Sequence, residues 1–229
     1  MLYEDNHLLI VNKPASIATM GTSAEETSVL DIAKTYIGRK YNKPGSVYLG
    51  VVSRLDSLVT GALVFARTSK AAARLAEQFR EHTVSKIYWA LVYGQPDGRQ
   101  GQLEHWLWRD DPARRTRVAN RQRPETQQAT LQWTLLATDS NVSLLEVQLE
   151  TGRKHQIRAQ LSHIGLPILG DARYDSRHSF PNGIALHSVS LSLTHPVTKQ
   201  IISVHAPLPR SWKRWEGLWQ EPCRRFTSR

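Results

Sequence analysis

Short apolar runs bounded by polar or turn residues recur along this chain and predict a fold rich in β-strands. Such runs occupy residues 8–11, 48–52, 62–66, 84–93, 131–137, 142–149, 184–193 and 201–204. Side chains alternate within residues 84–93, so Lys86 and Tyr88 are expected on one face of a strand. The polar residues 53–57 lie between two runs, which predicts a strand, a loop that contains Asp56, and a second strand.

Three segments carry apolar residues at helical spacing. One helix is expected to begin at the cap Ser28 and to end at Gly38. Another is expected to begin at Thr68 or Ser69. Its buried face is expected to consist of Ala72, Leu75, Ala76 and Phe79. A third is expected at residues 157–164, with basic side chains gathered at its start.

Residues 97–128 lack a sustained period and contain two prolines, so loops or a ragged hairpin insertion are expected there. Its concentrated arginines are Arg114, Arg115, Arg117, Arg121 and Arg123. They are candidates to contact nucleic-acid phosphates. A solvated basic surface has the same pattern, and the sequence leaves both interpretations open.

The composition indicates an ordinary folded protein with an excess of positive charge. Hydrophobic residues make up 40% and charged ones 22% of the 229 residues, which argues against a disordered or fibrous chain and fits one large domain. Lys and Arg number 30 against 20 Asp and Glu, a formal net charge of +10. Such a charge attracts polyanions, so nucleic acid is the expected partner, although charge that serves solubility alone gives the same count.

Cysteine usage and the amino terminus favour a protein of a reducing compartment. The single cysteine, Cys223, excludes an internal disulfide and a cysteine-rich zinc site. Residues 1–7 lack the basic start and apolar stretch of an export signal, and no segment approaches the about 20 apolar residues that span a membrane. We therefore expect a soluble cytoplasmic protein.

Candidate chemistry is concentrated in three places. These are the loop Arg54-Leu55-Asp56, the strand face with Lys86 and Tyr88, and the basic segment 153–158. A loop aspartate alone is weak evidence, because such residues commonly bond nearby amides or cap helices. The wider sequence pattern must decide what Asp56 does.

That pattern consists of several blocks in a fixed order. The first is residues 2–14, and the second joins Ser53-Arg54-Leu55-Asp56 to Val59-Thr60-Gly61. The later blocks are residues 65–70, 86–88, 151–158, 165–171, 185–187 and 194–196. Through these blocks the chain closely resembles the RluA-type pseudouridine synthases. The resemblance covers residues 1–209 as one catalytic domain and leaves a basic, Trp-containing tail at residues 210–229.

The resemblance implies an α+β catalytic domain with a long, mostly antiparallel mixed β-sheet, flanking helices and a central cleft. It implies an RNA pseudouridine synthase that isomerises specific uridines in structured ribosomal or transfer RNA. The reaction breaks a C–N bond and forms a C–C bond between the same base and sugar, so no cofactor, metal or donor is expected. The stacked target base has to be flipped into the pocket. A monomer is the default expectation.

The resemblance also assigns roles to site residues. Asp56 is expected to be the nucleophile, since a carboxylate attacks an electrophilic carbon and holds a covalent intermediate. Which carbon it attacks stays open. Arg158 is expected to pair with Asp56 and Tyr88 to stack on the target base. Three further residues are expected to bind the substrate, although each is equally explained as a surface charge: Arg54, Lys86 and Arg153.

The chain departs from the family pattern at Ser53, where histidine is usual, and at Thr60, where serine is common. We expect an altered substrate preference before any loss of activity. An amino-terminal RNA-binding module of the S4 type is not expected before Leu2, so RNA selection falls to the catalytic domain, its insertion or its tail. Three histidines that match the family are expected to be structural hydrogen-bonders and not metal ligands: His155, His187 and His195.

Two rival functions remain. A non-catalytic RNA-binding protein with the same fold is compatible with Ser53 and the basic charge. A nucleoside hydrolase that depends on a carboxylate is the other, but no second placed acid is recognisable.

Overall fold

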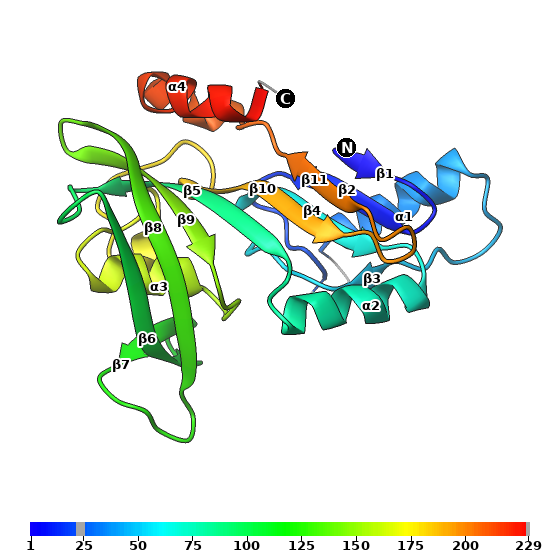
Figure 1. Ribbon diagram of the computed structural model, residues 1–229, viewed down its shortest axis with the longest axis horizontal. Helices are drawn as coiled ribbons and strands as arrows, with labels where there is room; N and C mark the ends of the chain where they lie inside the picture. The colour runs from blue at the N-terminus through cyan, green and yellow to red at the C-terminus, as the bar shows by residue number, and fades with distance from the viewer. Residues whose placement is uncertain (22–25, 228–229) are drawn as a thin grey trace. The chain divides into compact units, whose positions relative to one another are not determined.

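Two units, each built around antiparallel strands, make up the structure, a computed structural model that describes residues 1–21 and 26–227. Unit 1 consists of Met1–Ser85 and Ser188–Pro207, and unit 2 of Lys86–His187 and Leu208–Arg229. Each unit therefore combines segments that lie far apart in the sequence (Figure 1). The expected α+β class is confirmed, with helices packed against strands in both units.

Antiparallel strand pairs organise unit 1. Its strands are β1 (Tyr3–Glu4), β2 (Leu8–Lys13), β3 (Gly50–Val51), β4 (Thr60–Ala66), β10 (Leu186–Thr194) and β11 (Ile201–His205). The pairs are β1 with β2, β2 with β4, β3 with β4, and β10 with β11. The strand expected over residues 48–52 is shorter, because only Gly50 and Val51 are in register with β4. The expected loop that holds Asp56 is present between β3 and β4.

Gly61 allows β4 to approach the second segment of unit 1 closely. Its φ of 114° lies in a region that side chains disfavour. A Cβ atom at this position would lie 2.6 Å from the backbone nitrogen of Ser188 and still closer to its carbonyl oxygen. Glycine is therefore required just after the Asp56 loop, where the backbone course is fixed.

Two capped helices belong to unit 1. Helix α1 (Val29–Lys40) begins at Ser28, whose side chain accepts from the Asp31 amide as expected. It continues past Gly38 to Lys40, so the expected stop is wrong: Gly38 has a negative φ, and the chain leaves the helix only at Tyr41. Helix α2 (Ser69–Arg80) begins at Thr68, whose hydroxyl accepts from the Ala71 amide.

The core of unit 1 lies between α2 and the strands. Leu75 of α2 is fully buried with Leu8, Val64 and Leu191. The predicted buried face of α2 is corrected at one position, because Ala76 is exposed and Ala71 is buried in its place. The buried side of α2 therefore includes Ala71 of its first turn and not Ala76.

Unit 2 is built on a run of antiparallel strands in the order β5-β9-β8-β6-β7. These are β5 (Ser85–Tyr93), β9 (Val142–Leu149), β8 (Gln127–Asp139), β6 (Gln100–Asp110) and β7 (Arg115–Ala119). The expectation of loops or a ragged hairpin within residues 97–128 is wrong in detail. Regular strands β6 and β7 form a hairpin there, since both prolines fall in the connecting loops and remove no ladder hydrogen bond.

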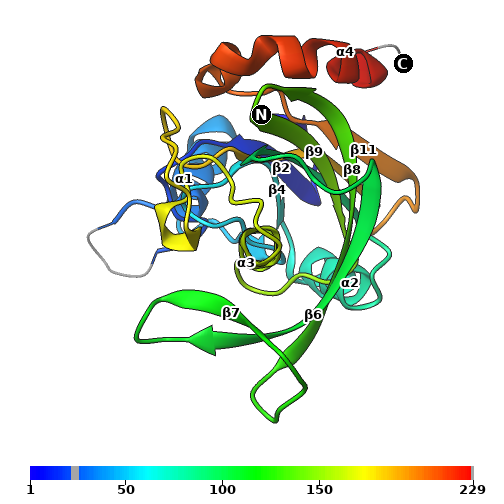
Figure 2. The same cartoon turned by 90° about the vertical axis from the view of Figure 1, so that its left-hand side faces the viewer.

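Helix α3 (Gln156–His163) packs on one face of these strands, beside β6 and β7 (Figure 2). Leu107 and Thr116 are buried on this face. Cross-strand partners place Tyr88, Val147 and Trp133 on the same face. The expected sharing of a face by Lys86 and Tyr88 agrees with β5, whose side chains alternate.

The carboxyl-terminal segment is helical and belongs to unit 2. The 3₁₀-helices η1 (Ala172–Tyr174) and η2 (Arg210–Trp215) and helix α4 (Glu216–Thr227) complete this unit, with α4 against β8 and β9. Trp212 is fully buried and contacts Phe180 and His187 edge to face. None of the helices in residues 1–21 and 26–227 is long and apolar enough to span a membrane.

Candidate active site

The loop that carries Asp56 is fastened to the body of unit 1 on both sides of this residue. The Thr19 hydroxyl donates to the Leu55 carbonyl oxygen at 2.8 Å and accepts from the Leu55 amide at 3.1 Å. The Val59 amide donates to the Asp56 carbonyl oxygen at 3.1 Å. Asp56 itself is half-buried and Arg54 is exposed. The carboxylate is thus held on a defined backbone at the protein surface.

A buried ammonium group supports the same loop. The side chain of Lys13, only 1% exposed, donates to the carbonyl oxygens of Pro14 and Ile17 at 2.7 Å and of Ser57 at 3.0 Å. Burial lowers the pKa of Lys13 to about 8, and the negative charge of Asp56 opposes this shift. Lys13 was not singled out as a site residue. The available signal was a lysine that follows four apolar residues and Asn12 at the end of a short strand.

Tyr88 and Lys86 lie at the start of β5 in unit 2. Tyr88 is 8% exposed and lies opposite Val147 of β9. The Lys86 ammonium lies 3.7 Å from the position that a Cβ atom of Gly152 would take. Burial lowers the pKa of Lys86. Two of the predicted site segments, β5 and residues 151–158, therefore meet within unit 2.

Arg158 is fixed by a buried ion pair with Asp171. Its Nε and Nη2 donate to the two carboxylate oxygens of Asp171 at 2.7 and 2.8 Å, and the two side chains are 3% and 1% exposed. The guanidinium also lies 4.7 Å from the ring centre of Tyr174. This bidentate arrangement sets the plane of the guanidinium. Asp171 lies in a block that carried the resemblance, but nothing in the sequence indicated Tyr174.

Tyr174 joins the segments around α3. Its hydroxyl accepts from the Thr116 amide at 2.7 Å and is hydrogen-bonded to Nδ1 of His155 at 2.9 Å. The Arg115 guanidinium lies 5.1 Å from its ring centre. Burial raises the pKa of Tyr174. A neutral tyrosine therefore ties β7 and the start of α3 together.

Gln156 holds the turn before α3. Its side-chain oxygen accepts from the Thr151 hydroxyl at 2.8 Å and from the Arg153 amide at 3.0 Å, and its nitrogen donates to the Thr130 carbonyl at 3.1 Å. Arg153 is exposed, and its Nε donates to the Gln128 carbonyl oxygen at 3.0 Å. Arg153 therefore has a structural contact of its own besides the expected role toward substrate.

The predicted site residues divide between the units. Asp56 and Arg54 belong to unit 1, whereas Tyr88, Lys86, Arg153 and Arg158 belong to unit 2. The ion pair expected between Asp56 and Arg158 stays a prediction.

His195 is hydrogen-bonded at both ring nitrogens. The amides of Val197 and Thr198 donate to its Nδ1 at 3.2 and 2.9 Å, so Nε2 carries the proton that it shares with Asp5 at 2.8 Å. His187 is buried against Trp212. Within the described part of the chain, no group of three or more His, Cys, Asp or Glu side chains is arranged to hold a metal ion.

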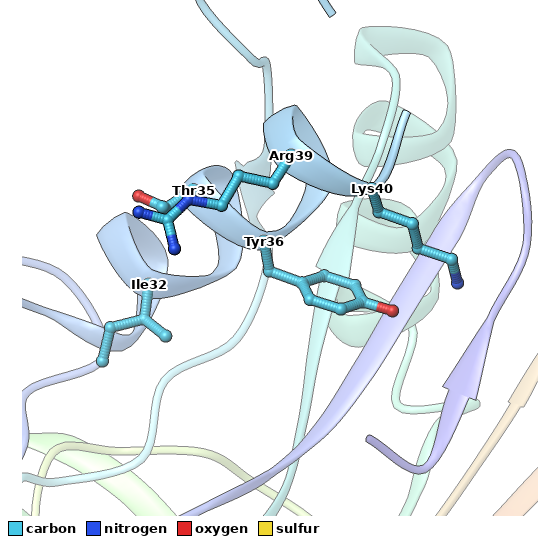
Figure 3. A pocket seen from close by; sticks show the side chains of 5 residues that line it. All are labelled: Ile32, Thr35, Tyr36, Arg39 and Lys40. Carbon is cyan, nitrogen blue, oxygen red and sulfur yellow. The ribbon is translucent and has the colours of Figure 1, made fainter. Parts of the chain in front are cut away.

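A surface hollow of about 470 Å³ lies along α1 and contains none of the predicted site residues. Its lining, shown in Figure 3, consists of Ile32, Thr35, Tyr36, Arg39 and Lys40. The Tyr36 hydroxyl and the Lys40 ammonium both donate to Glu4, at 3.0 and 2.8 Å. These contacts fasten α1 to β1, which gives this side of α1 a structural role.

Comparison with known proteins gives a consistent result. Residues 7–163 match the family described as RNA pseudouridylate synthase. The chain is 36% identical over 218 residues to an uncharacterized RNA pseudouridine synthase of Synechocystis sp., which covers 93% of this chain and 67% of that protein. It is 32% identical over 221 residues to ribosomal large subunit pseudouridine synthase D of Zymomonas mobilis, with 92% and 69% covered. The structure titled human RNA pseudouridylate synthase domain containing 4 superimposes with a TM-score of 0.77 at 25% identity, covering 93% and 91% of the two chains.

Proposed function

Because this chain belongs to the RNA pseudouridylate synthase family and is therefore an isomerase that acts on RNA, we propose that Asp56 is its nucleophile. The observation that carries the proposal is the way the Asp56 loop is held. Thr19 binds the backbone before Asp56, and the buried ammonium of Lys13 binds the carbonyl of Ser57 after it. A nucleophile held in place reacts faster, because the orientation is set before the substrate arrives.

The proposed substrate is specific uridines in structured RNA. Ribosomal RNA is favoured, since relatives of this chain are named ribosomal large subunit pseudouridine synthases C and D, and transfer RNA is the second candidate. The net charge of +10 suits a polyanionic partner. We propose that the enzyme works in the cytoplasm as a monomer without metal or cofactor, because the isomerisation exchanges bonds within one nucleotide.

In the proposed reaction the target uridine is flipped out of its stack. The Asp56 carboxylate attacks an electrophilic carbon and holds the nucleotide while the C–N bond breaks and the base turns. When the C–C bond forms, the bond to the carboxylate breaks, the base carbon that joins the sugar loses its proton with the help of Tyr88, and the freed ring nitrogen gains a proton. Tyr88 stacks on the base, and Arg158, held by Asp171, pairs with the nucleophile. The proposed contacts with the surrounding RNA come from Arg54, Lys86 and Arg153.

The test is a map of pseudouridine in total RNA from cells with and without this protein, made with a chemical adduct that stops reverse transcription. Sites lost on deletion should return with the wild type and with Asp97→Asn, a variant at an exposed loop position, but not with Asp56→Asn. Restoration by Asp56→Asn would exclude Asp56 as the nucleophile.

The same experiment separates the rival functions. If no site is lost and the purified protein modifies no RNA while binding it, a non-catalytic RNA-binding role replaces the proposal. Release of free uracil by the purified protein would instead indicate a hydrolase.

A further inference from the structure

Two tryptophans on β6 point away from the core of unit 2. Leu107 between them is buried, and His105 faces α3, where its Nδ1 lies 3.1 Å from the side-chain nitrogen of Gln160. Because side chains alternate along a strand, Trp106 and Trp108 lie on the opposite face of β6. Both are partly exposed.

This outer face, the face of β6, β7 and β8 opposite α3, is otherwise polar. The cross-strand partners of Trp106 are Ala119 and Gln128, and that of Trp108 is Arg117. Arg117 and Gln128 are exposed. Cross-strand pairing alone does not require tryptophan, because smaller β-formers such as valine or threonine also supply it. Two aromatic rings at alternate positions of a solvent-facing strand are instead the arrangement on which RNA bases stack in sheet-based RNA-binding domains.

The charges around the two rings suit a nucleic acid. Four exposed arginines belong to the segments next to the two tryptophans: Arg117, Arg121, Arg123 and Arg153. Arg121 and Arg123 lie in the loop of residues 120–126, which joins the two strands that flank Trp106. Arg153 reaches the backbone of Gln128, the residue opposite Trp106, at 3.0 Å. Two acidic residues of β6 oppose this positive charge: Glu104, which accepts from Gln128, and Asp110, which is paired with Arg117.

We propose that Trp106 and Trp108 form a stacking platform for unpaired bases of the RNA that this enzyme modifies, with the neighbouring arginines on the phosphates. The platform rests on the proposed RNA-modifying function and extends it, because it assigns a preference for single-stranded segments next to the target. Base stacking on aromatic side chains is tolerant of sequence and depends on the flat ring, whereas phosphate contacts alone do not distinguish single strands from duplexes. Arg153 connects the platform to the turn beside Lys86.

Binding of two labelled probes tests the platform. Fluorescence anisotropy is measured with a fluorescein-labelled single-stranded RNA of twelve nucleotides and with the duplex of the same sequence. The double variant Trp106→Leu/Trp108→Leu should bind the single strand about 10- to 100-fold more weakly, whereas Trp106→Phe/Trp108→Phe should stay within about threefold of the wild type. Duplex binding should not change. Trp219→Leu, at a partly buried tryptophan of α4, is the matched control.

Equal binding by the Leu and Phe variants would overturn the platform, as would an equal loss for the duplex. A cross-linking measurement on the wild type tests the platform even if the Leu variant fails to fold. The same single strand with 5-iodouridine should photo-cross-link to the peptide that contains Trp106 and Trp108, and cross-links found only elsewhere contradict the proposal. Loss of a dimer in the Leu variants without loss of RNA binding would identify the outer face as an interface between copies of this chain.

The experiments distinguish failure of the platform proposal from failure of the proposed catalytic function. If the single strand binds as expected but no RNA acquires pseudouridine, the platform stands and the proposed function falls. If pseudouridine forms normally in the Leu variants and their single-strand binding is intact, the platform falls and the proposed function stands.

Discussion

Lys13 is an ammonium group placed where water does not reach it. Its ammonium donates hydrogen bonds to three carbonyl oxygens, and the negative charge of Asp56 lies close enough to attract it. Removal of such a group leaves buried acceptors unsatisfied at about 1–3 kcal/mol each, so the lysine stabilises the loop although burial disfavours its charge. The Asp56 loop thus depends on a buried residue from another segment of unit 1.

The lowered pKa of Lys13 gives unfolding a particular dependence on pH. Between about pH 8 and the ordinary value of 10.5, the unfolded chain holds the Lys13 proton and the folded chain releases it. The unfolded state then binds more protons, so the free energy of unfolding rises with pH in this window. Lys13 should contribute a rise that approaches about 3 kcal/mol, from about 1.4 kcal/mol per pKa unit, and Lys13→Met should lack this contribution while it keeps that of Lys86. Urea unfolding of both proteins at pH 7, 8, 9 and 10 measures the difference, and a constant difference would contradict the lowered pKa.

Asp171 is expected to be a positioning residue for Arg158. Asp171→Asn removes a buried carboxylate that is paired with the Arg158 guanidinium, and breaking a buried ion pair typically costs about 3–5 kcal/mol. Turnover should fall more than apparent RNA affinity, because Arg158 is proposed to act at the nucleophile and not on the RNA backbone. The matched control is Asp175→Asn, since Asp175 pairs with Arg115 at 3.1 Å but is largely exposed, and it should cost less than about 1 kcal/mol. Similar effects of the two variants on unfolding and on kcat would contradict this role.

Some of these residues were accessible from the sequence and others were not. Asp56, Tyr88 and Arg158 were named because they lie in blocks of a recognised pattern, and their roles stay predictions. The support of Lys13 and of Asp171 became visible only with the fold. Burial of a charged side chain depends on contacts between distant segments, such as Lys13 with Ser57, and no local period reports them.

At the scale of elements, the sequence predicts the strands that are buried on both faces, but it does not predict the regular strands of the β6–β7 hairpin. The strand over residues 84–93 and the helix capped by Ser28 are confirmed because alternation and capping act locally. In β6 and β7, arginines and partly exposed tryptophans share the face that would be polar in a simple strand. The sequence therefore shows no regular alternation of apolar and polar residues there. The pairing with β8 establishes these strands, and only the folded chain shows it.

The loop of residues 120–126 is expected to contribute phosphate contacts. Its backbone is closed by Thr126, whose hydroxyl binds the amide and the carbonyl of Arg123, so side-chain changes there should leave its shape intact. Arg121→Gln/Arg123→Gln should reduce the slope of log affinity against log salt by about 1.4 for a single strand, from about 0.7 per phosphate contact. Titrations between low and moderate salt measure this slope. The control Arg80→Gln/Arg210→Gln removes two exposed charges elsewhere, and an equal change in slope would mean that only total charge matters.

At the scale of the whole molecule, each unit is completed by a segment from later in the chain. Residues 188–207 return to the unit of the amino terminus, and residues 208–229 return to that of residues 86–187. The boundary predicted at residue 209 lies next to one of these crossings. A linear sequence gives no sign of such returns, because each consists of ordinary strand or helix patterns whose partners are far away.

Truncation after residue 209 tests whether the last twenty residues are an appendage or part of unit 2. Trp212 is fully buried against Phe180 and His187, so the truncated chain should lose stability before it loses any specific RNA contact.

Trp212→Ala should cost about 3–5 kcal/mol by itself, as for other large core side chains. Trp212→Phe should be far milder, since it keeps a ring and removes an indole N–H that is buried without a partner among the described residues. If thermal unfolding of the truncated protein matched that of the wild type while RNA binding fell, the segment would be an RNA-binding tail and its burial irrelevant to the fold. The opposite result, unfolding at lower temperature in truncation and Trp212→Ala but not in Trp212→Phe, would make the segment a structural part of unit 2.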